Sequence, residues 1–279
     1  MLERTITGVV FIAVLIGCIL LGPYTFCGLF LLITLIGLNE FYSLSAKTGH
    51  QPAKVLGLLL GLLLFTGICS TFLPALSIIA YYPLALLFPL LFLVPIIELF
   101  RKKENPFANI ALTYLGVFYV ALPLTLLCML SHIKNRFEGI STHPYSSHIL
   151  LGFFFILWAS DTGAYLAGKA FGRHKLFERI SPKKTWEGTI GGAVLSLAVA
   201  WIVSRYFAII GLSAWLVVSL IIVVFGTFGD LTESLLKRSA DSKDSGSLLP
   251  GHGGILDRFD SLLLSVPFVF LYLAFTNSF

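Results

Sequence analysis

The sequence predicts an all-α polytopic membrane protein with about nine transmembrane helices, its N-terminus cytoplasmic and its C-terminus outside. Hydrophobic side chains form 57% of the 279 residues and charged ones only 12%, which is about half of the roughly 25% found in soluble proteins. The charge-free runs 5–39, 55–97, 105–133 and 206–229 all exceed the about 20 apolar residues that cross a bilayer. These features exclude a disordered chain, a nucleic-acid-binding module and a secreted disulfide scaffold.

Proline and glycine breaks divide the apolar runs into successive helices. The first span follows Arg4 and lacks a small-residue cleavage site, so we expect an uncleaved helix rather than a signal peptide. Gly22-Pro23 ends this span, the segment 70–74 turns the chain after the third, and Gly211 separates the seventh from the eighth. The spans are expected near residues 6–22, 24–44, 54–72, 75–99, 107–130, 148–169, 189–208, 212–235 and 261–277.

The distribution of lysine and arginine sets the orientation, because cytoplasmic loops are enriched in these residues. With the N-terminus inside, sixteen of the nineteen basic residues fall in cytoplasmic segments, and only Lys134, Arg136 and Arg205 fall outside. The net charge of +5 therefore indicates a membrane partner and no nucleic acid, since the basic residues form no continuous soluble face.

The four cysteines carry no recognisable ligand pattern. Cys18, Cys27, Cys69 and Cys128 lie inside apolar runs without CxxC spacing, and a cysteine in such a position behaves as a small hydrophobic residue. We expect neither a zinc site nor a disulfide from them.

Acidic residues gather in the second half of the chain, with five of fourteen in 1–150 and nine in 151–279. The chain has no internal repeat and no linker between soluble domains. We divide it by role into N-terminal scaffold helices, 1–147, available for dimer contacts, and a catalytic region, 148–279. The catalytic region includes two cytoplasmic loops, 170–188 and 236–260.

Asp161 lies deep in the sixth predicted span, where an ionised carboxylate costs at least about 2.5–3.5 kcal/mol. Asp161, Tyr165 and Lys169 recur at helical spacings of four and predict one polar stripe that faces other helices or a wet cavity. Such residues mark function more often than structure. A structural pairing with another helix is the alternative.

The end of the eighth predicted span carries Asp230, Ser234 and Lys237 on one helical face. Lys237 and Arg238 suit a helix that leaves the membrane, because cations favour helix C-termini and lipid headgroups. Asp230 sits at the unfavourable end of the helix dipole and needs a cation or a metal ion nearby.

The loop before the ninth span contains Pro250, Gly251, Gly253 and Gly254, which permit a tight turn whose backbone amides converge on an anion. Asp257 and Asp260 follow at the expected start of the helix, which is more acidity than capping requires. Loop 170–188 is electropositive, with five basic residues against two acidic ones, and Lys169 directly precedes it. Lipid headgroups alone could explain that charge.

Carboxylates, basic groups and a glycine-rich turn at one membrane face suit metal-assisted phosphoryl or nucleotidyl transfer onto a lipid phosphate. Carboxylates from two helices can hold Mg²⁺, while lysine and arginine neutralise phosphate charge. The lipid phosphate is already an anion, so the reaction needs no strong general base.

Residues 234–260 contain S-x-x-K-R-x4-K-D-x-G-x3-P-x-H-G-G-x2-D-R-x-D. These thirteen specified positions resemble the signature of the phosphatidate cytidylyltransferase family, also called CDP-diacylglycerol synthases. The segments W-x-x-D-T-G-A-Y, S-P-K-K-T-W-E-G and F-G-D-L-x-E-S resemble the same family, so the similarity covers about 158–260. The resemblance implies cytidylyl transfer from CTP to phosphatidic acid on the cytoplasmic face of a bacterial inner membrane. It also implies Mg²⁺, a nearby monovalent cation such as K⁺, and a homodimer.

The resemblance also implies roles for particular residues. The metal ligands would be Asp230 and Asp257, with Asp161 as a further acidic member. The residues for the CTP phosphates would be Lys237, Arg238, Lys243 and Arg258. Asp244 and Asp260 would position these basic side chains. Further substrate contacts would come from Ser181, Lys183, Lys184, Ser234, His252, Gly253 and Gly254.

Two other functions fit part of this pattern. A CTP- or ATP-dependent lipid or polyprenol kinase shares the metal and the basic loop. A cation-coupled secondary transporter would use Asp161, Asp230 and Asp257 as an ion pathway, but inverted repeats are expected of it and none is detected.

Overall fold

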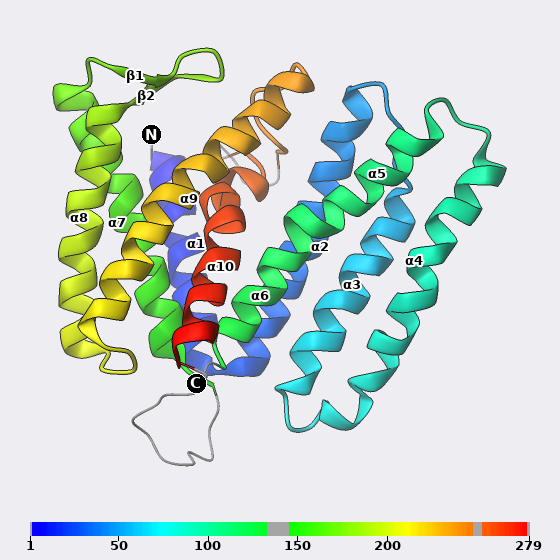
Figure 1. Ribbon diagram of the computed structural model, residues 1–279, viewed down its shortest axis with the longest axis horizontal. Helices are drawn as coiled ribbons and strands as arrows, with labels where there is room; N and C mark the ends of the chain where they lie inside the picture. The colour runs from blue at the N-terminus through cyan, green and yellow to red at the C-terminus, as the bar shows by residue number, and fades with distance from the viewer. Residues whose placement is uncertain (1, 133–144, 248–252, 278–279) are drawn as a thin grey trace. The chain divides into compact units, whose positions relative to one another are not determined.

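The computed structural model describes residues 2–132, 145–247 and 253–277, which form helices and one short hairpin (Figure 1). The helices are α1 (Leu2–Leu21), α2 (Pro23–Lys47), α3 (Lys54–Thr71), α4 (Tyr81–Arg101), α5 (Pro106–Gly116), α6 (Leu122–Leu130), α7 (Ser147–Phe171), α8 (Trp186–Tyr206), α9 (Leu212–Ser239) and α10 (Leu256–Asn277). A π-helical segment, η2 (Val117–Ala121), joins α5 to α6, and a 3-10 turn, η1 (Ser77–Ile79), precedes α4.

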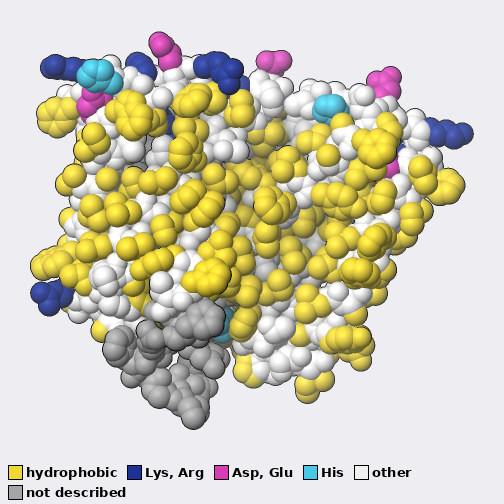
Figure 2. Space-filling model, in the orientation of Figure 1, with side chains coloured by type: hydrophobic (Ala, Val, Ile, Leu, Met, Phe, Trp, Pro, Cys, Tyr) yellow, Lys and Arg dark blue, Asp and Glu magenta, His cyan; other side chains and the backbone are white. Residues whose placement is uncertain are grey.

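Eight helical segments of the described residues are long and apolar enough to cross a membrane, and α1 adds the shorter apolar stretch Ile6–Leu21. Hydrophobic side chains cover the middles of the helices on the face drawn in Figure 2. The predicted all-α polytopic membrane fold is therefore confirmed. The orientation of the termini stays a prediction, and Lys134 and Arg136, on which it partly depends, lie outside the described residues.

Three helices begin at least three residues earlier than the hydrophobic pattern predicts, and the first of them is α1, which begins at Leu2 instead of residue 6. Helix α8 begins at Trp186 instead of 189, because the Thr185 hydroxyl accepts a hydrogen bond from the Gly188 amide at 3.1 Å and caps the helix. Helix α10 begins at Leu256 instead of 261. The apolar runs indicate where a helix enters the membrane, whereas the polar caps set where the helix begins.

The chain forms two compact units, and α9 and α10 each contribute to both. The first unit consists of Met1–Met129 and Leu236–Phe259, and the second of Leu130–Leu235 and Asp260–Phe279. The predicted division at 147 and 148 is a division by role, and it stays a prediction.

In the first unit, Tyr42 of α2 fixes the packing against neighbouring helices. Its hydroxyl donates to the Thr113 carbonyl of α5 at 2.7 Å, and the side chain is 1% exposed. A Cβ at Gly57 of α3 or Gly116 of α5 would collide with the Tyr42 ring. These glycines therefore let three helices approach closely around one aromatic side chain.

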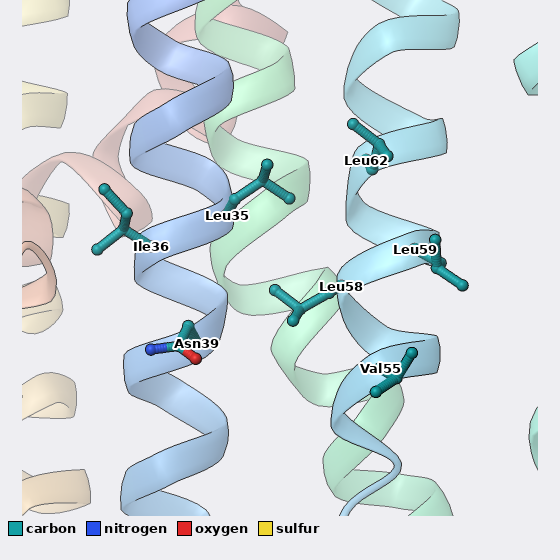
Figure 3. A pocket seen from close by; sticks show the side chains of 7 residues that line it. All are labelled: Leu35, Ile36, Asn39, Val55, Leu58, Leu59 and Leu62. Carbon is teal, nitrogen blue, oxygen red and sulfur yellow. The ribbon is translucent and has the colours of Figure 1, made fainter.

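An apolar groove of about 410 Å³ lies between α2 and α3 in the first unit (Figure 3). Its lining is aliphatic except for Asn39, and the residues are Leu35, Ile36, Asn39, Val55, Leu58, Leu59 and Leu62. Val55 is 70% exposed, so the groove is open to its surroundings. Its surface chemistry suits a hydrocarbon chain.

In the second unit, α7 and α8 lie side by side and are joined by a hairpin where the sequence predicts only a loop (Figure 1). The hairpin pairs β1 (Lys175–Phe177) with β2 (Ser181–Thr185) in antiparallel register. A Cβ at Gly163, Gly191 or Gly192 would crowd the facing helix. Small residues thus bring the two helix backbones together and hold the base of the hairpin beside α7.

Candidate functional site

Three carboxylates of the second unit, Asp161, Asp230 and Asp260, come from α7, α9 and α10. The negative charge of Asp230 acts on both of the others, as does the positive charge of Lys184. Asp161 is exposed, and Asp230 and Asp260 are half-buried. We call Asp161, Asp230, Asp260 and Lys184 the acidic cluster.

A glycine sets the approach of α9 to α10 at this cluster. A Cβ at Gly229 would collide with the Asp260 carbonyl oxygen, and one at Gly226 would contact Ser261. Because Gly229 directly precedes Asp230, the close helix crossing places the carboxylates of Asp230 and Asp260 near each other. Ser234, one turn further along α9, lies with its hydroxyl 3.3 Å from Asp230 Oδ1 and donates to it.

The hairpin supplies the cation of the acidic cluster. Lys184 lies on β2, and its Nζ is 2.7 Å from Asp230 Oδ2 and 3.4 Å from the Thr227 carbonyl. Glu187, at the start of α8, accepts hydrogen bonds from the amides of Arg173 and His174 and thereby ties the two ends of the hairpin together. Nothing in the sequence pattern predicts this role for Glu187.

The acidic cluster has a formal charge of −2, because it contains three carboxylates and one ammonium. Oxygen ligands from carboxylates are those that Mg²⁺ prefers. Bringing three like charges together is unfavourable unless a cation compensates them. The donor set therefore fits a divalent cation, and it includes Asp230, one of the two predicted metal ligands.

Asp257, the other predicted metal ligand, lies in the first unit at the start of α10. Its Oδ1 is 2.7 Å from Lys237 Nζ. Its Oδ2 accepts hydrogen bonds from the amides of Ser245 and Gly254 at 2.8 and 2.7 Å. Asp230 and Asp257 thus share one feature, since each carboxylate holds a lysine ammonium at 2.7 Å.

Glu40 of α2 is a buried carboxylate that is not among the predicted site residues. It is 6% exposed and accepts hydrogen bonds from the amides of Ile255 and Leu256, both at 3.0 Å. The Ser245 hydroxyl lies 3.0 Å from Glu40 Oε2 and 2.9 Å from Asp257 Oδ2. Glu40 therefore anchors the first turn of α10, where a negative charge is favourable, and Ser245 links it to Asp257.

In the described part of the glycine-rich turn, the Gly254 amide donates a hydrogen bond to the Asp257 carboxylate, and Pro250 and Gly251 lie outside the described residues. Gly253 has a φ of +81°, and a Cβ there would crowd Asp257. A Cβ at Gly254 would collide with Ser245 and with Glu40. A substrate contact at Gly253 and Gly254 stays a prediction, while His252 lies outside the described residues.

The remaining predicted residues lie on β2, at the end of α9, in the segment after it and at the start of α10. Ser181 is half-buried at the start of β2. Exposed side chains are those of Lys183, Arg238, Lys243, Asp244 and Arg258. Exposed cations are suited to bind phosphate groups, and the roles of all these residues stay predictions.

Replacing Gly229 with alanine is expected to lower both stability and activity, because the new Cβ forces α9 away from α10 at Asp260. Overpacking of this kind costs about 1–3 kcal/mol. Thermal unfolding followed by tryptophan fluorescence measures the effect, since Trp158, Trp186, Trp201 and Trp215 all lie in the second unit. Gly17→Ala is the control, because its Cβ would meet no atom within 4 Å. Equal unfolding temperatures for the two variants would contradict this account of the helix crossing.

The fold, the acidic cluster and the Lys237–Asp257 pair define a polytopic membrane protein with carboxylate–lysine pairs near the ends of its spans. The cytidylyltransferase family model matches residues 2–276. A Staphylococcus haemolyticus phosphatidate cytidylyltransferase is 33% identical over 95% of both chains, and a Staphylococcus aureus protein of the same name is 35% identical over 95% of both. A phosphatidate cytidylyltransferase of Haemophilus influenzae is 44% identical over 49% of both chains. This chain belongs to the cytidylyltransferase family.

Proposed function

We propose that this protein transfers a cytidylyl group from CTP to phosphatidic acid, giving CDP-diacylglycerol and pyrophosphate for phospholipid synthesis. The observation that carries the proposal is the match to proteins named phosphatidate cytidylyltransferase over 95% of both chains. The carboxylate–lysine pairs Lys184–Asp230 and Lys237–Asp257 give that activity a chemical basis.

In the proposed reaction a phosphate oxygen of phosphatidic acid attacks the α-phosphorus of CTP. A new phosphorus–oxygen bond forms, the bond to the β-phosphate bridge breaks, and pyrophosphate leaves with the electron pair. The attacking oxygen is already anionic, so the residues of this chain need not remove a proton from it. Their work is to orient two highly charged substrates and to offset their mutual repulsion.

The lysines and the carboxylates of the pairs Lys184–Asp230 and Lys237–Asp257 have different roles in this reaction. Lys184 and Lys237 are the ammoniums closest to the proposed metal ligands, so they are placed to contact phosphate oxygens. Asp230 and Asp257 would hold Mg²⁺, which supplies charge stabilisation for the phosphates when bound. Asp161 and Asp260 add negative charge beside Asp230, and a monovalent cation such as K⁺ would be a further counterion.

The protein is an integral membrane protein by the length and apolarity of its helices. The groove between α2 and α3 is available to an acyl chain, because its lining is aliphatic except for Asn39. We place the reaction at the cytoplasmic face of a bacterial inner membrane, on the basis of the lysine and arginine distribution, and we propose a homodimer.

Purified protein with phosphatidic acid, Mg²⁺ and CTP labelled at either the α- or the γ-phosphate tests the reaction. The proposal predicts that α-label enters the lipid and that γ-label is released as pyrophosphate. Entry of γ-label into the lipid would identify a kinase instead. If no label enters the lipid in either experiment, and vesicles containing the protein carry a cation flux, the protein would be a transporter.

A further inference from the structure

Three cysteines of the first unit meet inside the protein, although the sequence gives them no ligand spacing. Cys27, Cys69 and Cys128 come from α2, α3 and α6, and their sulfur atoms all lie within 4.8 Å of one another. Cys27 Sγ and Cys128 Sγ are 3.2 Å apart. All three side chains are buried and unoxidised, whereas Cys18 of α1 is outside the group and half-buried.

The helix packing of the first unit explains why these cysteines converge. A Cβ at Gly61 of α3 would collide with Leu38 of α2 and contact Ala121 of η2. The glycine therefore allows α3 to lie close to both α2 and the segment that leads into α6. Residues far apart in the chain become neighbours for this reason, and we call Cys27, Cys69 and Cys128 the thiol cluster.

A pocket of about 340 Å³ reaches the thiol cluster, and Cys27 and Cys69 both line it. Tyr24 and Ile79, which also line the pocket, are 49% and 50% exposed, so it opens to the surroundings. No lining side chain carries a carboxylate, an ammonium or a guanidinium. The pocket therefore has no means of neutralising a phosphate group, and its reactive atoms are sulfurs.

The geometry of the cluster fits one soft ion bound by three sulfurs. A metal–sulfur bond of about 2.3 Å in a planar three-ligand site separates the sulfurs by about 4 Å. Structural zinc sites nearly always have four protein ligands, and among the described residues no histidine, carboxylate or fourth cysteine joins this group. Cysteine ligands select Cu(I) among the ions that accept fewer ligands.

Binding of a metal ion displaces protons from the thiols that become its ligands. The three sulfurs are the only metal-binding atoms of this group among the described residues, and a soft monovalent ion that needs no further ligand fits such a site. We propose that Cys27, Cys69 and Cys128 form a binding site for a soft monovalent cation of the Cu(I) class. The site is separate from the cytidylyl-transfer residues and does not depend on that reaction.

An anaerobic titration tests the proposal with Cu(I) as the probe, competed by a chromophoric Cu(I) chelator, on the full chain in detergent. We expect one tightly bound Cu(I) per chain in the wild type and in Cys18→Ser, the matched control. We expect at least about a 10-fold loss of affinity in Cys27→Ser, Cys69→Ser and Cys128→Ser. Unchanged affinity in these three variants, or no binding by the wild type, would overturn the proposal.

X-ray absorption spectroscopy of the copper-loaded wild type gives a second test that needs no variant to fold. The expected spectrum contains three sulfur neighbours at about 2.3 Å. A shell of nitrogen or oxygen atoms would show that copper binds elsewhere and would overturn the assignment. Neither measurement involves CTP or lipid, so failure of this proposal and failure of the proposed function are distinguishable.

Discussion

Asp230→Asn is expected to reduce pyrophosphate release at least about 100-fold, a loss comparable to removal of one charge-stabilising group from an active site. Asparagine keeps the size of aspartate and can still accept from Ser234, but it lacks the charge that holds Lys184 at 2.7 Å and that would hold a metal ion. The measurement is the initial rate of pyrophosphate release with saturating CTP and phosphatidic acid.

Asp241→Asn is the matched control for this experiment. Asp241 is exposed, and its φ of +46° is a conformation that asparagine adopts readily. We expect its rate to equal that of the wild type. A normal rate in Asp230→Asn, with the unfolding temperature unchanged, would remove Asp230 from the reaction.

Glu40→Ala is expected to destabilise the first unit by about 2–5 kcal/mol, because the buried amides of Ile255 and Leu256 lose their acceptor. The Ser245 hydroxyl can turn to Asp257, so it adds little to this loss. The turn that carries Gly254 and the start of α10 would then lose their anchor. We therefore expect activity to fall in parallel, although Glu40 need not touch a substrate.

Thermal unfolding with a thiol-reactive fluorophore measures this effect, because the buried Cys27, Cys69 and Cys128 all lie in the first unit. Glu104→Ala, at an exposed position of the same unit, is the control and should unfold like the wild type. Glu40→Gln keeps one acceptor oxygen and should recover part of the stability. If Glu40→Ala unfolds at the temperature of Glu104→Ala, the anchoring role is wrong.

The sequence predicts the helical fold well, because a long apolar segment that crosses a membrane must pair its own backbone polar groups, and an α-helix does so. It predicts the hairpin of residues 175–185 poorly. Lys175, Lys183 and Lys184 there follow no alternating pattern, and the hairpin depends on Glu187 and on the cap formed by Thr185. The predicted first residues of the helices are wrong for the same reason, because polar caps and not apolar runs determine where a helix begins.

Within the candidate site, the sequence indicates the carboxylates but not their partners. Asp161, Asp230 and Asp260 stand out as acids in or beside spans, and the structure brings them together with Lys184. Most acidic residues lie in the second half of the chain and draw attention away from Glu40, yet an acid inside the span 24–44 is itself a signal of function. No sequence pattern predicts the thiol cluster, because its three cysteines become neighbours only when three helices pack together.

The central proposal is that Asp230 and Asp257 are each required for binding of divalent ions, and binding of Mn²⁺ in place of Mg²⁺ tests it most directly. Electron paramagnetic resonance counts bound Mn²⁺ in the presence of a non-hydrolysable CTP analogue. The account predicts bound Mn²⁺ in the wild type and in Asp241→Asn, and a loss of affinity of more than about 10-fold in Asp230→Asn and in Asp257→Asn. Wild-type affinity in both site variants would contradict it.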